Sequence, residues 1–408
     1  MDQVLSDLSV GELAHTIVGR PHSFLNDSIR GELAHLEHAY GGRRVLILGA
    51  AGSIARQTLR VILQLQPAYV GLVDVSENGL AEVVRSIRSS DAVLPGTTVE
   101  PWLVDIGSAI FPRVMHEVGD VDRVLNFAAF KHVRSERDVP SLLRMLEVNI
   151  VATHRATAYV AESQPNAYQF VVSTDKAADP ANFMGASKRA TELVAVSACP
   201  SISTARFANV AFSSGSLLES WLRRISDRLP VSVPRDTWRY FVTPEEAGQL
   251  CILASVAPRA SVVIPNFATD RLVELEHALT LVLAACGHEP EYVNDVASGV
   301  SALQHPSGRH DLRYPVIATD RDTSGEKRAE QFLGAGEHAE PWIDGLDGFP
   351  IQGEDSSGFP MSLFVERIAE FVADPTIPVR LDDLRELMKQ AIPTFRHVRA
   401  ASRLDDRA

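Results

Sequence analysis

The 408-residue sequence is poor in cysteine, and this scarcity limits what the chain can be. Its three cysteines, Cys199, Cys251 and Cys286, are far apart and odd in number. They form no closely spaced pair of the kind that binds zinc, and they imply no disulfide framework. No metal site is therefore expected, and we expect the protein in a reducing compartment.

Long apolar runs are also absent. No run reaches the roughly 18 residues that a membrane-spanning helix requires. The first residues, Met1, Asp2 and Gln3, lack the basic and then apolar pattern of a signal peptide. These two absences predict a cytoplasmic protein that does not insert into membranes.

The chain has no excess of positive charge. Lysine and arginine together number 39 against 52 acidic residues, which gives a net charge of −13. Because phosphate backbones require clustered cations, we expect no nucleic-acid partner. A local basic pocket for one diphosphate is still compatible with this balance. With 45% hydrophobic residues, the chain can bury the cores of two or three packed units.

What the sequence does contain is an alternation of apolar runs and helical patterns. Runs typical of buried parallel strands occur at 44–48, 69–75, 99–104, 121–127 and 169–173, with helical patterns at 53–66 and 76–90. This rhythm predicts an α/β fold, a Rossmann-like doubly wound parallel sheet.

Four segments are expected along the chain. Short amphipathic helices form an N-terminal extension over 1–42, and the doubly wound domain covers 43–212. Repeated prolines after Phe212 indicate a smaller substrate-binding domain over 213–345, interleaved with the first, and 346–408 form a C-terminal helical segment. Within these segments we expect 304–324 to be loop and 355–374 to be a helix preceded by turns.

A glycine-rich loop joins the first predicted strand to the first helix. It reads Gly49-Ala50-Ala51-Gly52-Ser53-Ile54-Ala55. The first glycine permits a tight turn, and the second lets backbone amides approach a pyrophosphate at the helix N-terminus. Ala55 replaces a third glycine and adds only a methyl group. An ordinary turn is the alternative, but the position between a buried strand and an amphipathic helix favours a dinucleotide site. Its predicted contacts are Gly49, Ala51, Gly52, Ser53 and Ile54.

Residues at the ends of later strands complete the predicted cofactor site. Asp74 would accept hydrogen bonds from the adenosine ribose and repel a 2′-phosphate, and no arginine follows it directly. NAD is therefore favoured and NADP is the alternative, while a helix cap is the other interpretation of Asp74. Asp105 and Ile106 are placed to contact the adenine. Ala128 and Ala129 are placed to contact the nicotinamide side of the cofactor.

Six short motifs then occur in one order. They are Ala128-Ala129-Phe130-Lys131-His132-Val133, Ser173-Thr174-Asp175-Lys176-Ala177, Met184-Gly185-Ala186-Ser187-Lys188-Arg189, Arg206-Phe207-Ala208-Asn209-Val210, Arg239-Tyr240-Phe241 and Ser324-Gly325-Glu326-Lys327. Together they resemble the inverting UDP-N-acetylglucosamine 4,6-dehydratases, which are extended short-chain dehydrogenase/reductases of bacterial surface-polysaccharide and glycan pathways. The resemblance runs from about Ile17 to Phe332. Larger members of that family carry membrane helices ahead of this region, and no such helix is expected here.

The resemblance implies a reaction in which the cofactor is regenerated. A hydride leaves C4 of the sugar for NAD(P)+, the C5 proton is removed, water leaves from C6, and the hydride returns to C6. The resemblance assigns Lys176 to the C5 proton, Asp175 to acid/base work at C6 or the C4 hydroxyl, and Thr174 to aligning the sugar. A carboxylate beside an ammonium in a water-poor cleft can have shifted pKa values. A salt-bridged turn is the alternative.

Methionine occupies the position of the scaffold's catalytic tyrosine. In the Tyr-x-x-x-Lys pair of the resembled scaffold, Met184 replaces the tyrosine and Lys188 remains to hold the nicotinamide ribose. Methionine cannot accept the C4 hydroxyl proton, so Asp175 or another group must do so. The larger members of the resembled family also carry methionine here.

Several polar residues are expected to contact the substrate, a UDP-sugar. They are Lys131, His132, Asn209, Arg239, Glu326 and Lys327. Arginine suits a diphosphate because it forms bidentate hydrogen bonds. A structural histidine is the alternative for His132, and a surface salt bridge for Arg239. By analogy with the scaffold, pairing through helices at about 141–162 and 184–198 predicts a homo-oligomer.

The sequence therefore predicts an NAD(P)-dependent nucleotide-sugar 4,6-dehydratase that acts on UDP-N-acetylglucosamine or a related sugar. A 4- or 5-epimerase or a 5,6-dehydratase shares the first hydride step and stays open. The missing tyrosine also keeps open a non-catalytic cofactor-binding module.

Overall fold

The computed structural model describes residues 9–89, 96–131, 136, 138–304, 312–320, 327–351 and 358–397. Its largest element is a nine-stranded sheet in the order β14-β15-β10-β6-β5-β4-β1-β2-β3. The strands are β1 (Arg44–Leu48), β2 (Tyr69–Asp74), β3 (Thr98–Leu103), β4 (Arg123–Asn126), β5 (Tyr168–Val172), β6 (Ile202–Ala205), β10 (Ser261–Pro265), β14 (Glu340–Ile343) and β15 (Leu346–Pro350). Seven of them, from β3 to β10, pair in parallel, and β15 and β14 add an antiparallel hairpin at one edge. The order from β3 to β6 is that of a doubly wound Rossmann fold, so the predicted fold class is confirmed.

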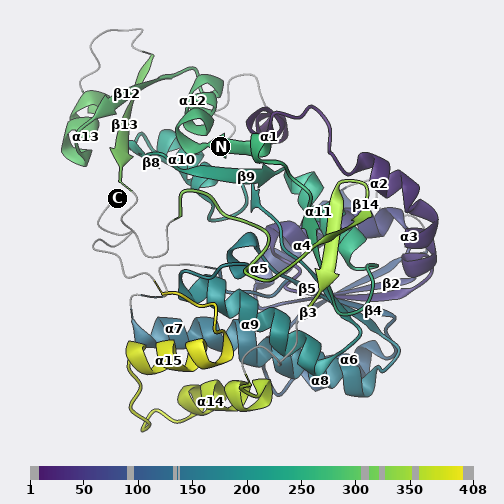
Figure 1. The fold of residues 1–408 in the computed structure, drawn as a ribbon. Helices are drawn as coiled ribbons and strands as arrows, with labels where there is room; N and C mark the ends of the chain where they lie inside the picture. The colour runs from purple at the N-terminus through teal and green to yellow at the C-terminus, as the bar shows by residue number, and fades with distance from the viewer. Residues whose placement is uncertain are drawn as a thin grey trace.

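Strand β1 shows why a strand in the middle of this sheet is apolar, whereas the edge strand β3 is largely exposed. Val45 and Ile47 pack into one hydrophobic cluster, and Leu46 and Leu48 pack into another on the opposite face. Helices α4 (Ser53–Gln64), α5 (Glu77–Arg88) and α11 (Pro244–Ala254) cover the first face, while α6 (Phe111–Val118), α8 (Thr153–Ser163) and α9 (Phe183–Ala198) cover the second (Figure 1). A strand buried on both faces has no polar side to alternate with.

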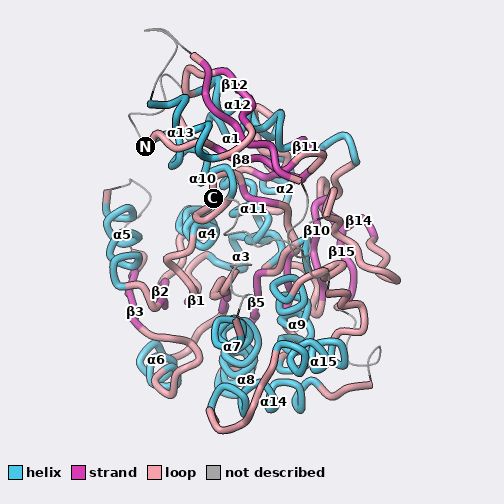
Figure 2. The backbone as a smooth tube through the Cα atoms, turned by 90° about the vertical axis from the view of Figure 1, so that its left-hand side faces the viewer, coloured by secondary structure: helices cyan, strands magenta, loops and turns pink. Residues whose placement is uncertain are grey.

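A smaller unit, here called the cap, lies over one end of this sheet (Figures 1 and 2). Its three parallel strands are β8 (Val231–Pro234), β12 (Glu289–Val293) and β13 (Arg313–Thr319), and its helices are α10 (Leu217–Ser226), α12 (Leu275–Ala285) and α13 (Val296–Gln304). Helix α1 (Val10–Val18) packs against α12 and joins the core of the cap. A short sheet of β7 (Asn209–Val210), β9 (Trp238–Val242) and β11 (Leu272–Glu274) connects the cap to the main sheet.

The prediction that 304–324 is loop is wrong for 313–319, which form strand β13. Tyr314 and Val316 point into the core of the cap, and β13 lies between β12 and β8. Pro315 inside this run is the reason for the error, because proline within an apolar run argues against a central strand. The flanking residues 305–311 and 321–326 lie outside the described part of the chain.

After residue 212 the chain returns to the main sheet. Helix α11 packs against α4, and strands β10 and β15 extend the sheet itself. The predicted segments 43–212 and 213–345 therefore share one sheet, and the predicted boundary at 346 falls inside the β14–β15 hairpin. In the N-terminal extension the predicted short helices are confirmed as α1, α2 (Asn26–Gly31) and α3 (Leu33–Tyr40).

Two C-terminal helices form a further layer beneath α7 and α9 (Figure 1). Helix α14 (Met361–Ala373) confirms the helix predicted at 355–374, and α15 (Leu381–Ala391) follows it. Helix α14 packs against α7 (Val139–Leu146), the π-helix η2 (Glu147–Ala152) and α9. The chain's own helices thus cover one side of the helices that were predicted to pair two subunits. Within the described ranges, no helix is both long and apolar enough to span a bilayer.

Candidate active site

A cavity of about 490 Å³ lies at the carboxyl ends of the parallel strands, where the cap faces the main sheet. Its wall is formed by Gly52, Ser53, Ile54 and Ala55 at the start of α4, Phe127, Ala129 and Lys131 after β4, Val172, Ser173, Thr174 and Lys176 at the end of β5, Met184 and Lys188 on α9, residues 207–210, 213 and 215–218, and Pro234, Arg239, Phe241 and Leu275. This is the edge at which open α/β sheets bind their ligands.

The glycine-rich loop is shaped for close approach of another group. Gly49 has φ +74°, and a Cβ there would lie 2.5 Å from the Ala128 nitrogen, so only glycine fits. Gly52 forms the N-cap of α4, and Ser53 and Ile54 begin the helix at the cavity wall. The first-turn amides of a helix have no intrahelical acceptor. The glycine at 49 lets the loop pack against the backbone of Phe127 and Ala128, and the start of α4 offers the donors that a pyrophosphate needs.

Of the predicted cofactor residues after the loop, Ala129 and Lys188 line the cavity, whereas Asp74, Asp105, Ile106 and Ala128 do not. Asp74 accepts hydrogen bonds from the Ala51 nitrogen and from the Ser76 nitrogen, each at 2.9 Å, so it braces the loop. Ser76, not Asp74, caps α5, which removes the capping alternative for Asp74. Asp105 binds the Gly107 nitrogen at 2.8 Å.

Arg56 is a cation that binds the same loop as Asp74, and it precedes Asp74 in the sequence. Its guanidinium reaches back from α4 to the carbonyl oxygens of Ala51, at 3.1 Å, and Gly79, at 3.4 Å. It is four residues past the loop's second glycine, so only the fold brings it beside the end of β2.

Met184 and Lys188 both line the cavity from α9, as their spacing of four residues predicts. The Lys188 Nζ donates to the Val172 carbonyl oxygen at 2.5 Å. Burial, opposed in part by the Glu192 carboxylate, lowers the pKa of Lys188 to about 8. Lys188 can therefore change its charge near neutral pH.

The turn after β5 brings Thr174, Asp175 and Lys176 together, as the sequence predicted. Asp175 Oδ1 accepts from Thr174 Oγ1 at 2.8 Å and from Lys176 Nζ at 3.0 Å. Thr174 and Lys176 line the cavity, whereas Asp175 is 1% exposed and lies behind them. Asp175 Oδ2 is buried and has no hydrogen-bond partner among the residues that the structure describes. The Asp175 carboxylate thus does not line the cavity itself but binds Thr174 and Lys176, which do.

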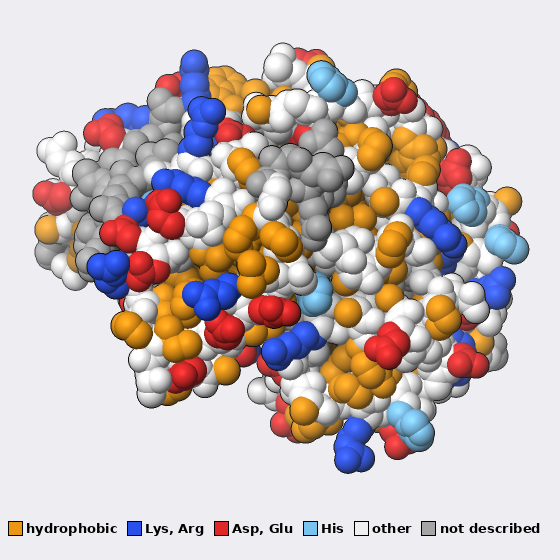
Figure 3. Space-filling view, turned by 60° about the horizontal axis from the view of Figure 1, so that its bottom comes forward, with side chains coloured by type: hydrophobic (Ala, Val, Ile, Leu, Met, Phe, Trp, Pro, Cys, Tyr) orange, Lys and Arg blue, Asp and Glu red, His pale blue; other side chains and the backbone are white. Residues whose placement is uncertain are grey.

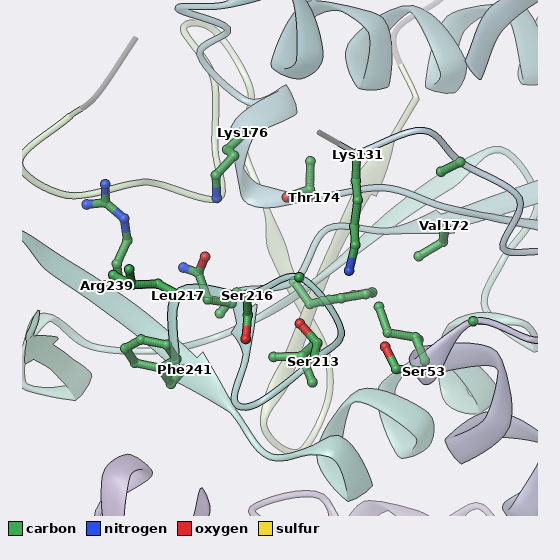
Figure 4. A pocket seen from close by; sticks show the side chains of 18 of the residues that line it. Ser53, Lys131, Val172, Thr174, Lys176, Ser213, Ser216, Leu217, Arg239 and Phe241 are labelled. Carbon is green, nitrogen blue, oxygen red and sulfur yellow. The ribbon is translucent and has the colours of Figure 1, made fainter. Parts of the chain in front are cut away.

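Lys176 is charged in this site. Burial favours the neutral amine, but the carboxylates of Asp175 and Glu330 outweigh burial and the nearby Arg239, so the pKa of Lys176 is raised. Figure 4 shows Lys176 and Lys131 extending into one space from two different elements, with Arg239 to one side of it. The result is a cationic cavity inside an acidic protein.

The predicted substrate residues divide into three groups. Lys131, Asn209 and Arg239 line the cavity. Lys327 does not, because it forms salt bridges with Asp179 (3.1 Å) and Glu330 (3.6 Å). His132 and Glu326 lie outside the described residues.

Lys131 and Arg239 are held by backbone oxygens, whereas Lys176 is paired with the Asp175 carboxylate. Lys131 Nζ donates to the Ser214 carbonyl oxygen at 2.5 Å, and burial, opposed by Glu219, lowers the pKa of Lys131. Arg239 Nη1 donates to the carbonyl oxygens of Trp238 and Lys327 at 2.8 and 3.0 Å. Arg239 forms no salt bridge with any residue that the structure describes.

Sequence reasoning missed two contributors to the cavity. One is the loop that ends at Ser216, which caps α10 by accepting from the Glu219 nitrogen. A serine three residues before a glutamate and an apolar run was the available signal. The other is Asn149 in η2, which binds both backbone groups of Phe130, at 2.7 and 2.9 Å, and Ser187 Oγ. Nothing local marks Asn149, because its partners are distant in sequence.

A buried ionic network supports the cavity from behind. Arg206 binds Glu192 with two hydrogen bonds of 2.7 Å and Glu337 on its other side, and Ser173 Oγ donates to Glu192 at 2.6 Å. Burial opposes the charge of Glu192, but Arg206 prevails and lowers the pKa of Glu192 to about 2. Arg206, which begins one of the six motifs, is therefore structural.

Comparison with known proteins gives three findings. The profile of the family described as "Polysaccharide biosynthesis protein" matches residues 45–300. A UDP-N-acetylglucosamine 4,6-dehydratase (inverting) of Campylobacter jejuni is 26% identical over 255 residues, which are 59% of this chain and 72% of that protein. The probable polysaccharide biosynthesis protein EpsC of Bacillus subtilis is 27% identical over 317 residues, which are 76% of this chain and 48% of EpsC. The chain thus spans about half the length of that Bacillus relative.

One solved structure has a closely similar fold. The X-ray structure of Pen from Bacillus thuringiensis matches with a TM-score of 0.61 at 21% identity, and the match covers 76% of this chain and 87% of Pen. At that identity the likeness shows the fold alone.

Proposed function

The chain belongs to the polysaccharide biosynthesis protein family, and on that premise we propose that it is an NAD-dependent 4,6-dehydratase of a nucleotide-activated sugar. UDP-N-acetylglucosamine is the first-choice substrate, because Campylobacter relatives at 25 and 26% identity carry that activity in their names. The family resemblance that the sequence motifs predicted is confirmed.

The residues present fit a dinucleotide cofactor. Gly52 and the N-terminus of α4 at the cavity wall, together with the ammonium of Lys188, would hold its pyrophosphate and nicotinamide ribose. When bound, NAD+ would take the hydride from C4 of the sugar and return it to C6. Asp74 at the end of β2 favours NAD, and Arg56 beside it keeps NADP as the alternative.

The observation that carries the proposal is the Thr174–Asp175–Lys176 turn on the cavity wall. Met184 cannot accept the C4 hydroxyl proton, so another group must do so. Thr174 Oγ1 faces the cavity and already donates its proton to Asp175 Oδ1. It can accept the C4 hydroxyl proton while it passes its own proton to the carboxylate. Asp175 thereby acts as the base without touching the sugar.

Lys176 meets the sugar as an ammonium, because its pKa is raised. It must lose this proton before it can take the C5 proton that the resemblance assigns to it. Asp175, which pairs with Lys176 at 3.0 Å, therefore bears on the elimination step as well as on the first one.

Met184 favours one second candidate, a module that binds the cofactor without catalysis. It lines the cavity where the scaffold's tyrosine would act. Epimerases and a 5,6-dehydratase share the first hydride step and differ in the product.

The test is to incubate the protein with UDP-N-acetylglucosamine and catalytic NAD+ in deuterated water. Mass spectrometry and proton NMR should show loss of one water and a new methyl group, with deuterium at C5. A Lys176→Ala variant should abolish both changes. Exchange at C5 without loss of water would indicate an epimerase, and an unchanged sugar with bound NAD+ would indicate the binding module.

A further inference from the structure

The segment that follows α15 packs against the start of α9. Phe395 is 2% exposed, and the rings of Phe395 and His397 contact the ring of Phe183, with centroids 5.3 and 5.1 Å away. Phe183 and Met184 are the first residues of α9, and Met184 lines the cavity. A part of the chain beyond the residues 45–300 that the family profile matches therefore supports the helix end that carries a cavity residue.

Glu136 joins this segment to the first turn of α9. Its Oε1 accepts from the Met184 nitrogen at 3.2 Å, and its Oε2 lies 3.5 Å from His397 Nε2. The side chains of Glu136 and His397 are 8% and 10% exposed, and Glu136 Oε2 has no hydrogen bond to any described residue. First-turn amides lack an intrahelical acceptor, and a carboxylate there faces the positive end of the helix. Glu136 therefore caps α9 from outside, beside the N-cap Asn182, which accepts from the Gly185 nitrogen.

Arg385 determines which nitrogen of the His397 ring carries the hydrogen. Arg385 Nε, on α15, donates to His397 Nδ1 at 3.3 Å, and Arg385 Nη1 pairs with Asp382 at 2.6 Å. Because Nδ1 accepts, the ring hydrogen is on Nε2, the nitrogen that lies near Glu136 Oε2. A buried carboxylate oxygen is costly unless a donor or a cation lies near it. Contacts therefore run from α15 to the cavity wall.

We propose that Glu136 and His397 are positioning residues whose contact places Met184 on the cavity wall. Glu136 follows Lys131 closely in the sequence, so its carboxylate joins two parts of that wall, the stretch after β4 and the first turn of α9. Met184 occupies the position of the scaffold's tyrosine and has no polar side-chain group of its own, so backbone contacts and packing must place it. The consequence for turnover rests on the proposed function, whereas the placement of Met184 is a property of the fold.

NMR of the methionine methyl groups tests the contact directly. The chain has six methionines, and Met184→Leu identifies the Met184 signal by its loss. His397→Phe keeps a ring against Phe183 but removes the Nε2 hydrogen, so the Met184 signal should move or broaden. His397→Gln is the matched control. It loses the ring but keeps an N–H donor for Glu136, so the Met184 signal should stay closer to its wild-type position. The signal of Met115, which packs in a different cluster, should stay unchanged in both variants and reports an intact fold.

An unchanged Met184 signal in His397→Phe would overturn the proposal. An equal or larger change in His397→Gln would also overturn it, because ring packing alone would then place Met184. If His397→Phe does not fold, Glu136→Leu removes the same contact from its other side and should change the same signal.

Turnover gives a second readout. Because Lys131 and Arg239 keep their backbone partners, His397→Phe should lower kcat by about 10- to 100-fold and leave KM for the nucleotide sugar within about twofold. A loss confined to KM would contradict the placement of Met184 as the cause. A wild-type protein that leaves every nucleotide sugar unchanged would count against the proposed function, while the NMR comparison would still decide the role of the Glu136–His397 contact.

Discussion

At the scale of the residue, Gly49 is the position with the least freedom. Its φ is +74°, and an added Cβ would meet backbone atoms of Phe127 and Ala128 at 2.5–2.8 Å. Gly52 has φ −65°, and a Cβ there would lie 3.2 Å from the Gly49 oxygen. We predict that Gly49→Ala loses NAD+ binding and about 1–3 kcal/mol of stability, whereas Gly52→Ala loses less of both. Calorimetric titration with NAD+ and thermal unfolding would measure this, and tight binding by Gly49→Ala would contradict it.

The lowered pKa of Lys188 predicts that the stability of the fold depends on pH. Its folded-state pKa is about 8, below the ordinary value of 10.5. Between these values the unfolded chain binds more protons at this site, so stability rises with pH from 8 toward 10.5 and is lower below pH 8. The contribution is at most about 3 kcal/mol.

Lys188→Met should remove this dependence in the cofactor-free protein. Urea unfolding at pH 7 and pH 9.5 would then give a smaller gain for Lys188→Met than for the wild type. Identical gains in the two proteins would show that the Lys188 amine titrates normally.

At the scale of the element, the π-helix η2 places Asn149 against the loop that carries Lys131. The Asn149 amide, which is itself 1% exposed, binds both backbone groups of Phe130. We predict that Asn149→Ala costs about 2 kcal/mol, because buried partners are left without hydrogen bonds, and weakens NAD+ binding as the loop loosens. Thr153→Val is the control, since Thr153 bonds only within the helix. Equal losses in both variants would assign the effect to η2 as a whole.

Elements whose evidence is local could be predicted from the sequence. Strands β1, β2, β4 and β5 contain buried apolar runs, and the phosphate loop and the Thr174–Lys176 turn each lie within a few residues. Contacts between distant residues could not be predicted. Arg56 on Gly79, Asn149 on Phe130 and Lys327 on Asp179 join residues between 19 and 148 positions apart. Strand β13 was missed for a local reason, the proline within it.

At the scale of the whole molecule, the C-terminal helices bear on the predicted assembly. The predicted homo-oligomer pairs helices at 141–162 and 184–198, and α14 covers that region with its own apolar face. Figure 3, which turns the lower side of Figure 1 toward the viewer, shows acidic and basic side chains interspersed with apolar ones. We therefore expect that two copies of the chain do not dimerise through α7 and α9, whatever contacts they make elsewhere.

Two adjacent residues of α14 test this expectation. Phe364 is fully buried, whereas Leu363 is 41% exposed on the outer side. Phe364→Asp would place a charge in the core between α14 and its neighbours, release the helix and uncover the apolar surface beneath it, at a cost of about 3–5 kcal/mol. Size-exclusion chromatography with light scattering should then show larger species for Phe364→Asp and an unchanged mass for Leu363→Asp. If cross-links in the unaltered protein already join α7 or α9 of two copies, α14 does not block that face, and the pairing known from the scaffold holds for this chain as well.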